Sequence, residues 1–125
     1  MIVLDSHLKS FEIVLAGAKN TSDAHWVVSF VRVVNGVPQR WASREGVTNG
    51  STDVTMLEAP NARDAFLIRS VYLSNADAAT ITPTFKVNNG ADRQVFKAAA
   101  VPVGGSVCMG QDGQWRTFAA SGALL

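Results

Sequence analysis

The chain lacks the features that define several common classes of protein. It has one cysteine, Cys108, so no internal disulfide can form, and no cysteine–histidine spacing suggests a zinc site. No apolar run approaches the roughly 18 residues that a membrane-spanning helix needs, and the first ten residues lack the apolar stretch of a signal peptide. We therefore expect a protein that folds in a reducing cytoplasm without disulfides and without a membrane partner.

Charge is also scarce. Charged residues make up 17% of the 125 residues, and 11 basic side chains against 10 acidic ones leave a net charge of +1. This balance argues against a dedicated nucleic-acid binder, which needs a concentrated basic surface. Hydrophobic residues reach 47%, which excludes a disordered chain. A chain of this length buries about two-thirds of its surface on folding, which suits one domain over residues 1–125.

Short segments rich in valine, isoleucine, threonine and aromatic residues run along the whole chain, separated by turn residues. Asn35-Gly36 and Asn49-Gly50 are strong hairpin signals. No segment predicts more than a single helical turn. The predicted strands cover residues 8–15, 25–34, 39–42, 52–58, 65–74, 80–87, 93–99, 106–109 and 114–118.

Eight or nine short strands without covering helices predict an all-β fold, an antiparallel β-sandwich. The strand count favours a jelly-roll-like form. An immunoglobulin-like sandwich is the alternative, although the cysteine–tryptophan–cysteine pattern of that fold is missing.

Two predicted strands are apolar on both faces, whereas a sandwich strand is expected to turn one polar face to water. In residues 25–34, one face carries Trp26, Val28 and Phe30, and the other carries Val27, Val31 and Val33. In residues 65–74, one face carries Phe66, Ile68 and Tyr72, and the other carries Leu67, Val71 and Leu73. Each large side chain left in water forgoes roughly 1.5–3 kcal/mol. Either the termini and the loop predicted over residues 36–51 cover the second faces, or other protein chains do.

Cover by other chains predicts a protein interface. The apolar termini fit this interpretation, since free chain ends are usually polar. An arginine next to a tryptophan in the predicted loop is typical of an interface hot spot. The predicted interface residues are Ile2, Val3, Leu4, Val27, Val31, Val33, Arg40, Trp41, Leu67, Val71, Leu73, Leu124 and Leu125.

No residue combination predicts catalysis, and we expect no catalytic residue, no metal ligand and no cofactor. His7 and His25 are interpreted as structural or surface residues, and Cys108 as a small buried hydrophobe. The segment Asn75-Ala76-Asp77 is interpreted as a turn rather than a calcium loop. A sandwich enzyme with a site assembled around His25 is the least favoured hypothesis.

Three segments resemble small virion proteins of tailed phages. Residues 8–18 resemble their first strand, which ends in an Ala-Gly-Ala step before a second, apolar strand. Residues 68–77 are similar to their central strand, where an Asn-x-Asp step begins a hairpin. Residues 101–106, followed by 112–115, resemble their last two strands. The resemblance implies a capsid cement or decoration protein with a jelly-roll-like fold.

The resemblance and the apolar faces together predict a non-enzymatic virion protein. We expect it to bind the major capsid protein and copies of itself, to staple neighbouring subunits on the capsid surface, and to be assembled in the host cytoplasm. The alternative is a tail, head–tail or fibre-associated sandwich. Such a protein would bind another virion protein or a host glycan, the glycan through Trp41 or Trp115.

Overall fold

The computed structural model describes residues 1–125 and contains strands but no helix. An all-β fold is thus confirmed, with ten strands rather than eight or nine. The strands are β1 (Ile2–Leu4), β2 (Ser10–Leu15), β3 (His25–Val34), β4 (Val37–Val47), β5 (Val54–Leu57), β6 (Asp64–Ser74), β7 (Pro83–Asn88), β8 (Asp92–Lys97), β9 (Ser106–Met109) and β10 (Trp115–Phe118).

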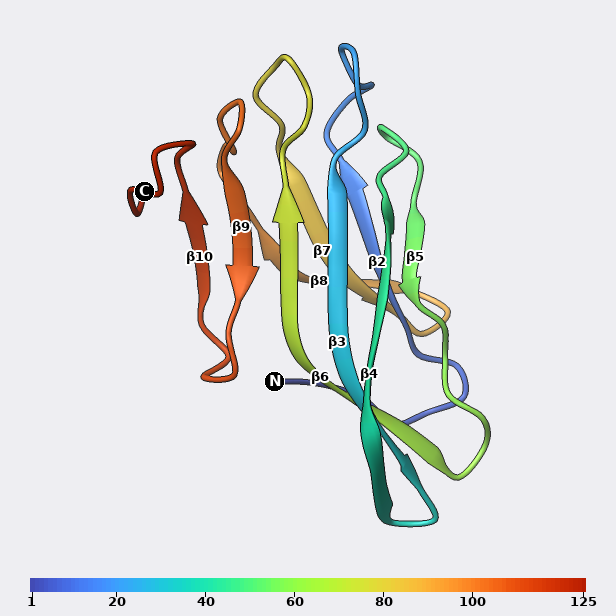
Figure 1. Ribbon diagram of the computed structural model, residues 1–125. Helices are drawn as coiled ribbons and strands as arrows, with labels where there is room; N and C mark the ends of the chain where they lie inside the picture. Colours follow the sequence, from blue (N-terminus) through green and yellow to red (C-terminus); the bar gives the residue numbers. More distant parts are fainter.

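Two antiparallel sheets pack face to face as the predicted sandwich (Figure 1). The first sheet has the order β10-β9-β6-β3-β4, and β1 also pairs with β6; the second has the order β5-β2-β7-β8. Strand β6 is long enough to hold two neighbours along one side. β1 pairs with its first half, where Ile2 faces Ile68, and β9 pairs with its second half, where Leu73 faces Val107. This arrangement is compatible with a jelly roll.

A cluster of 21 buried hydrophobic residues fills the space between the sheets. The rings of Phe11 and Phe85, on adjacent strands of the second sheet, stack with centroids 6.1 Å apart. Trp115 of the first sheet packs on Phe85 at 4.8 Å and on Phe96 at 4.7 Å, both in the second sheet. These aromatic contacts join the two layers at the β8–β10 side of the sandwich.

The β3–β4 hairpin is longer than predicted. Its turn residues, Asn35 and Gly36, have φ values of 49° and 80°, as the predicted two-residue hairpin requires. β4 extends from Val37 to Val47, well beyond the strand predicted over residues 39–42, so the loop predicted over residues 36–51 is mostly strand. Nearly every residue of β4 is exposed, which explains why its sequence lacks an apolar alternation. The lower end of this hairpin projects beyond the second sheet (Figure 1).

A β-bulge in β6 overturns part of the predicted face assignment. Ser29 pairs with Ser70 and Phe30 pairs with Ile68, so Arg69 is an extra residue on β6. The insertion shifts the alternation by one position, and residues on both sides of it point into the core. Val71 and Leu73 are buried at 1% and 0% exposure, whereas Tyr72 is 48% exposed.

Cys108 does not belong to the core. Cys108 is half-buried on the outer side of β9, because its neighbours Val107 and Met109 point into the core. The prediction of a buried Cys108 was therefore wrong.

With no helix in the chain, no helical segment could cross a membrane.

Candidate protein-binding surface

Four apolar side chains form a continuous row across the outer face of the first sheet. Val31 of β3 pairs directly with Trp41 of β4 and with Leu67 of β6, and Leu67 pairs with Val3 of β1. Directly paired residues project from the same face of a sheet. We call Trp41, Val31, Leu67 and Val3 the outer row. It crosses four strands, or about 14 Å at the usual strand spacing.

The two ends of the outer row meet water. Trp41 is 51% exposed and Val3 is 45% exposed, while Val31 is covered by its neighbours. Val27 and Tyr72, which pair with each other, extend the apolar surface toward the other end of the same face. The face therefore presents apolar surface that no other part of the chain covers.

The bulge supplies the charged group beside this surface. The Arg69 guanidinium lies over the Trp41 ring, 4.5 Å from its centroid, in a cation–π contact. Arg69 and Tyr72 were missing from the predicted interface, because an alternation without a bulge places Tyr72 in the core. The arginine that stacks on Trp41 is thus Arg69 of β6, whereas Arg40, the sequence neighbour of Trp41, lines the cleft beside β4.

Four of the predicted interface residues belong to the core instead. Ile2, Leu4, Val71 and Leu73 belong to the hydrophobic cluster between the two sheets, with exposures of 9%, 0%, 1% and 0%, so their assignment to an outer surface was wrong. The N-terminal segment is buried because it forms β1 against β6 of its own chain.

The other predicted residues lie outside the core cluster, and all but Val31, which its neighbours cover to 6% exposure, reach the surface. Val3, Val31, Leu67 and Trp41 form the outer row, and Val27 and Val33 lie on the same face of β3. Leu124 and Leu125 are 63% and 65% exposed at the C-terminus. Arg40 lines a cleft beside β4, which Trp41 of the outer row also borders.

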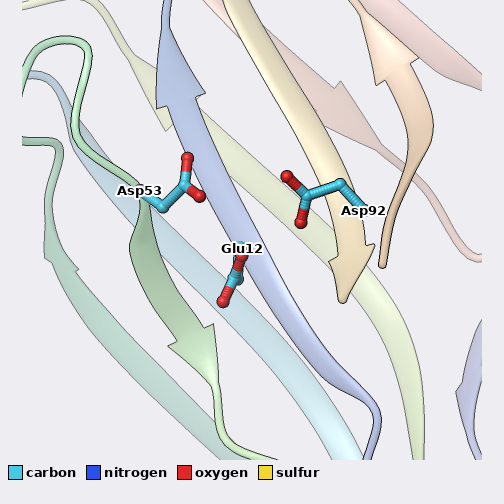
Figure 2. Close-up of side chains that lie close together, drawn as sticks. All are labelled: Glu12, Asp53 and Asp92. Carbon is cyan, nitrogen blue, oxygen red and sulfur yellow. The ribbon is translucent and has the colours of Figure 1, made fainter. Parts of the chain in front are cut away.

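The outer face of the second sheet is polar. Figure 2 shows Glu12, Asp53 and Asp92 gathered there, with carboxylate oxygens within 4.8 Å of one another. Lys86, the direct partner of Glu12 across β2 and β7, places its Nζ 2.8 Å from Asp53 and 2.7 Å from Asp92. The ammonium group thus already neutralises part of the charge that would attract a cation.

The protonation of Lys86 reflects this arrangement. Partial burial disfavours its charged form, but the hydrogen bonds and ion pairs with Asp53 and Asp92 outweigh that penalty and raise the pKa of Lys86 above its ordinary value. The cluster is accordingly a structural ion-pair network, and the two outer faces of the sandwich differ sharply in polarity.

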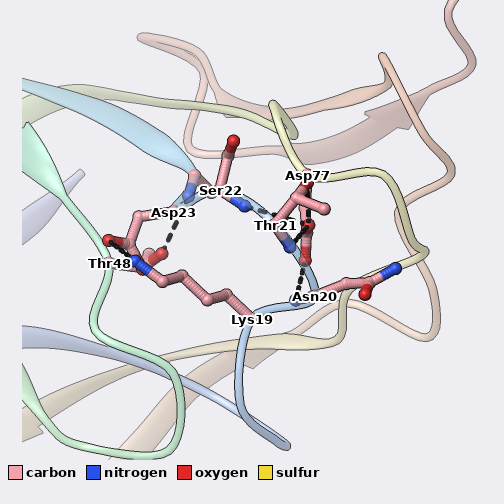
Figure 3. Close-up of polar contacts among 8 residues, drawn as sticks. Lys19, Asn20, Thr21, Ser22, Asp23, Thr48 and Asp77 are labelled. Carbon is pink, nitrogen blue, oxygen red and sulfur yellow. Dashed lines mark hydrogen bonds and ion pairs between the residues drawn. The ribbon is translucent and has the colours of Figure 1, made fainter.

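The Asn75-Ala76-Asp77 segment holds two loops together. Asp77 accepts hydrogen bonds from the backbone N–H groups of Asn20 and Thr21 at 2.8 and 2.7 Å (Figure 3). These bonds hold the pKa of Asp77 well below its ordinary value. The Asn75 side-chain amide donates to the Val101 carbonyl at 3.0 Å, and its Oδ1 accepts from the Asp77 N–H at 2.9 Å. The oxygens of this segment are engaged by the protein, in agreement with its interpretation as a turn.

The remaining aromatic and titratable candidates have ordinary surroundings. Trp115 is packed between the sheets, so its ring is not a free platform for a sugar. His7 and His25 are exposed, in agreement with their interpretation as structural or surface residues. Comparison with protein-family models, with curated proteins and with solved structures returned no match.

Proposed function

We propose that the protein is a non-enzymatic structural component of a tailed-phage virion, which decorates the capsid and staples neighbouring capsid subunits. The outer row carries this proposal. Trp41 and Val3 are about half exposed on a face with no covering segment, while the opposite outer face of the sandwich is built around Lys86 and carboxylates. One-sided apolar exposure of this kind is characteristic of a surface that docks on another protein.

The composition of the row suits a protein partner. Tryptophan and arginine are the residue types that most often dominate the binding free energy of an interface, and here Arg69 lies over Trp41. Stacking holds the Trp41 ring in place before binding, which lowers the entropy lost when a partner covers it. The three segments that resemble phage virion proteins support the major capsid protein as the partner.

Stapling requires that each copy makes more than one contact. A copy that contacts two capsid subunits, or one subunit and another copy of itself, makes its second contact at a high effective concentration. Individually weak contacts then resist separation together. The net charge of +1 agrees with a partner that is protein rather than packaged DNA.

A location in the tail, the head–tail junction or a fibre is the alternative. The outer row would serve equally there to bind another virion protein. Glycan binding has less support, because Trp115 is packed against Phe96 and Arg69 already lies over one face of Trp41.

A matched pair of variants tests the proposal. Val3→Asp places a charge in the outer row, and Val14→Asp places the same charge on the outer side of β2, next to Thr84 of β7 in the second sheet. We expect Val3→Asp to weaken cosedimentation with empty shells of the major capsid protein by about tenfold or more, as a disrupted hot spot does, and Val14→Asp to leave it unchanged. Wild-type protein that does not cosediment with shells would refute the capsid assignment.

A further inference from the structure

Strand β4 is a long open edge. It ends the order of the first sheet, runs for 11 residues from Val37 to Val47, and pairs only with β3. The other sheet edges are shorter or covered. β5 and β8 have four and six residues, and the C-terminal segment folds along β10, where the Leu125 N–H donates to the Thr117 carbonyl at 2.8 Å. An open edge presents unpaired backbone N–H and C=O groups, which another chain can pair with.

A basic cleft of about 590 Å³ runs beside this edge, and Trp41 also borders it. Its floor includes Phe30 and Phe66, whose rings meet edge to face at 5.1 Å. Arg40 and Arg44 line the cleft and are exposed, and neither forms an ion pair with a carboxylate of the chain. Arg32, which also lines it, is different, because it is paired with Asp64 at 2.7 Å.

We propose that β4 receives an extended acidic segment of another protein, which adds to the first sheet as a further strand. Its backbone pairs with the open edge of β4, and its carboxylates face Arg40 and Arg44. The proposal rests on the proposed function in that the donor is another virion protein. A polypeptide is the occupant that fits both features, because only a polypeptide can continue the backbone ladder of a sheet.

The spacing of the two arginines defines the segment. They are four residues apart on β4 and line the same cleft as Ala42, which lies between them and is paired to Phe30. An added strand with acidic residues at every second position places carboxylates opposite both guanidinium groups. Arginine pairs with carboxylates through two parallel hydrogen bonds, which gives such a segment both affinity and register.

The probe is a blocked octapeptide of alternating glutamate and threonine, titrated into the full-length protein and followed by NMR shifts of the β4 amides. We expect saturable binding that weakens about tenfold or more in Arg40→Glu/Arg44→Glu, where two attractive contacts become repulsive. The control variant, Arg93→Glu/Lys97→Glu, makes the same charge change on edge strand β8 and should bind the peptide as the wild type does. A lysine–threonine octapeptide should not bind.

Backbone pairing is tested on the peptide itself. Two further peptides carry N-methyl groups on either the odd or the even residues, which removes the N–H donors of one edge and leaves the charges intact. Strand addition predicts that one of the two loses binding. Equal binding by both peptides, or tighter arginine-dependent binding of a single-stranded DNA oligonucleotide, would overturn the proposal.

The two proposals fail separately. Peptide binding should survive Val3→Asp, which alters only the outer row. A wild-type protein that binds capsid shells but not the acidic peptide would end the strand-addition proposal and leave the proposed function standing. A protein that binds the acidic peptide but no capsid shell would end the proposed capsid function and leave strand addition at β4 standing.

Discussion

Leu67→Ala and Leu73→Ala form the sharpest test of the structure. The same substitution is made at two positions of β6, and the expected losses of unfolding free energy differ in size. Leu73 is fully buried, and its truncation leaves a cavity between the sheets, which should cost about 3 kcal/mol of unfolding free energy. Leu67 is half-buried in the outer row, and its site opens to water. Truncation there should cost about 1 kcal/mol, because little apolar area is re-exposed and no cavity forms.

Urea denaturation and thermal melting of the isolated protein measure both costs. For a chain of 125 residues, 1 kcal/mol corresponds to about 4 °C in Tm, so we expect losses of about 12 °C for Leu73→Ala and about 4 °C for Leu67→Ala. Only Leu67→Ala should weaken shell binding without first unfolding the protein. Equal losses of stability would mean that the outer row is buried within the isolated chain, and a mild Leu73→Ala would mean that the bulge is misplaced.

Three further predictions concern stability. Asp77→Asn should lower Tm at pH 7. The folded-state pKa of Asp77 is depressed, so its stabilising contribution is present above the unfolded pKa of 3.8 and is lost as the pH falls through the lower folded pKa. Melting curves at decreasing pH should therefore show that the wild type loses stability more steeply than the variant. Lys86→Met should destabilise at pH 7, because Glu12, Asp53 and Asp92 then face one another without the ammonium group between them. Unlike the wild type, this variant should gain Tm from millimolar calcium. Gly46→Ala should destabilise by about 1–3 kcal/mol in urea titrations, because a Cβ there would lie 2.5 Å from the Trp26 ring; an unchanged midpoint would contradict that packing.

Much of the fold can be predicted from local patterns. The strands of the core alternate clearly, and Asn35-Gly36 marks the longest hairpin without ambiguity. Only residues 39–42 of β4 are predicted as strand, because both faces of β4 are exposed and the rest of it looks like a loop. β1 escapes detection because three residues are too few for a pattern, and only β6 gives them a partner.

The binding surface is less predictable, since its definition depends on a single inserted residue. Periodicity places Val71 and Leu73 on the same side as Leu67, and no property of Arg69 signals that the strand gains a residue there. Adding one residue exchanges the two faces of everything that follows. Sequence alone therefore identifies two strands that are apolar on both faces but assigns Val71 and Leu73 to the wrong face.

The bulge links the core to the proposed docking face. Because Arg69 is inserted, Ile68 and Leu73 both point inward, Tyr72 turns outward, and the Arg69 guanidinium is free to lie over Trp41. A regular strand would expose Val71 and Leu73 and bury Tyr72, at a cost of several kcal/mol. The burial of Val71 and Leu73 therefore stabilises the bulge, and the bulge keeps the outer row on the outer face. The Lys86 network on the opposite sheet leaves that side polar, which restricts apolar association to one face of the sandwich. A single apolar face lets a copy dock on another protein without polymerising through both sides of the sandwich, which agrees with the proposed decoration of a capsid.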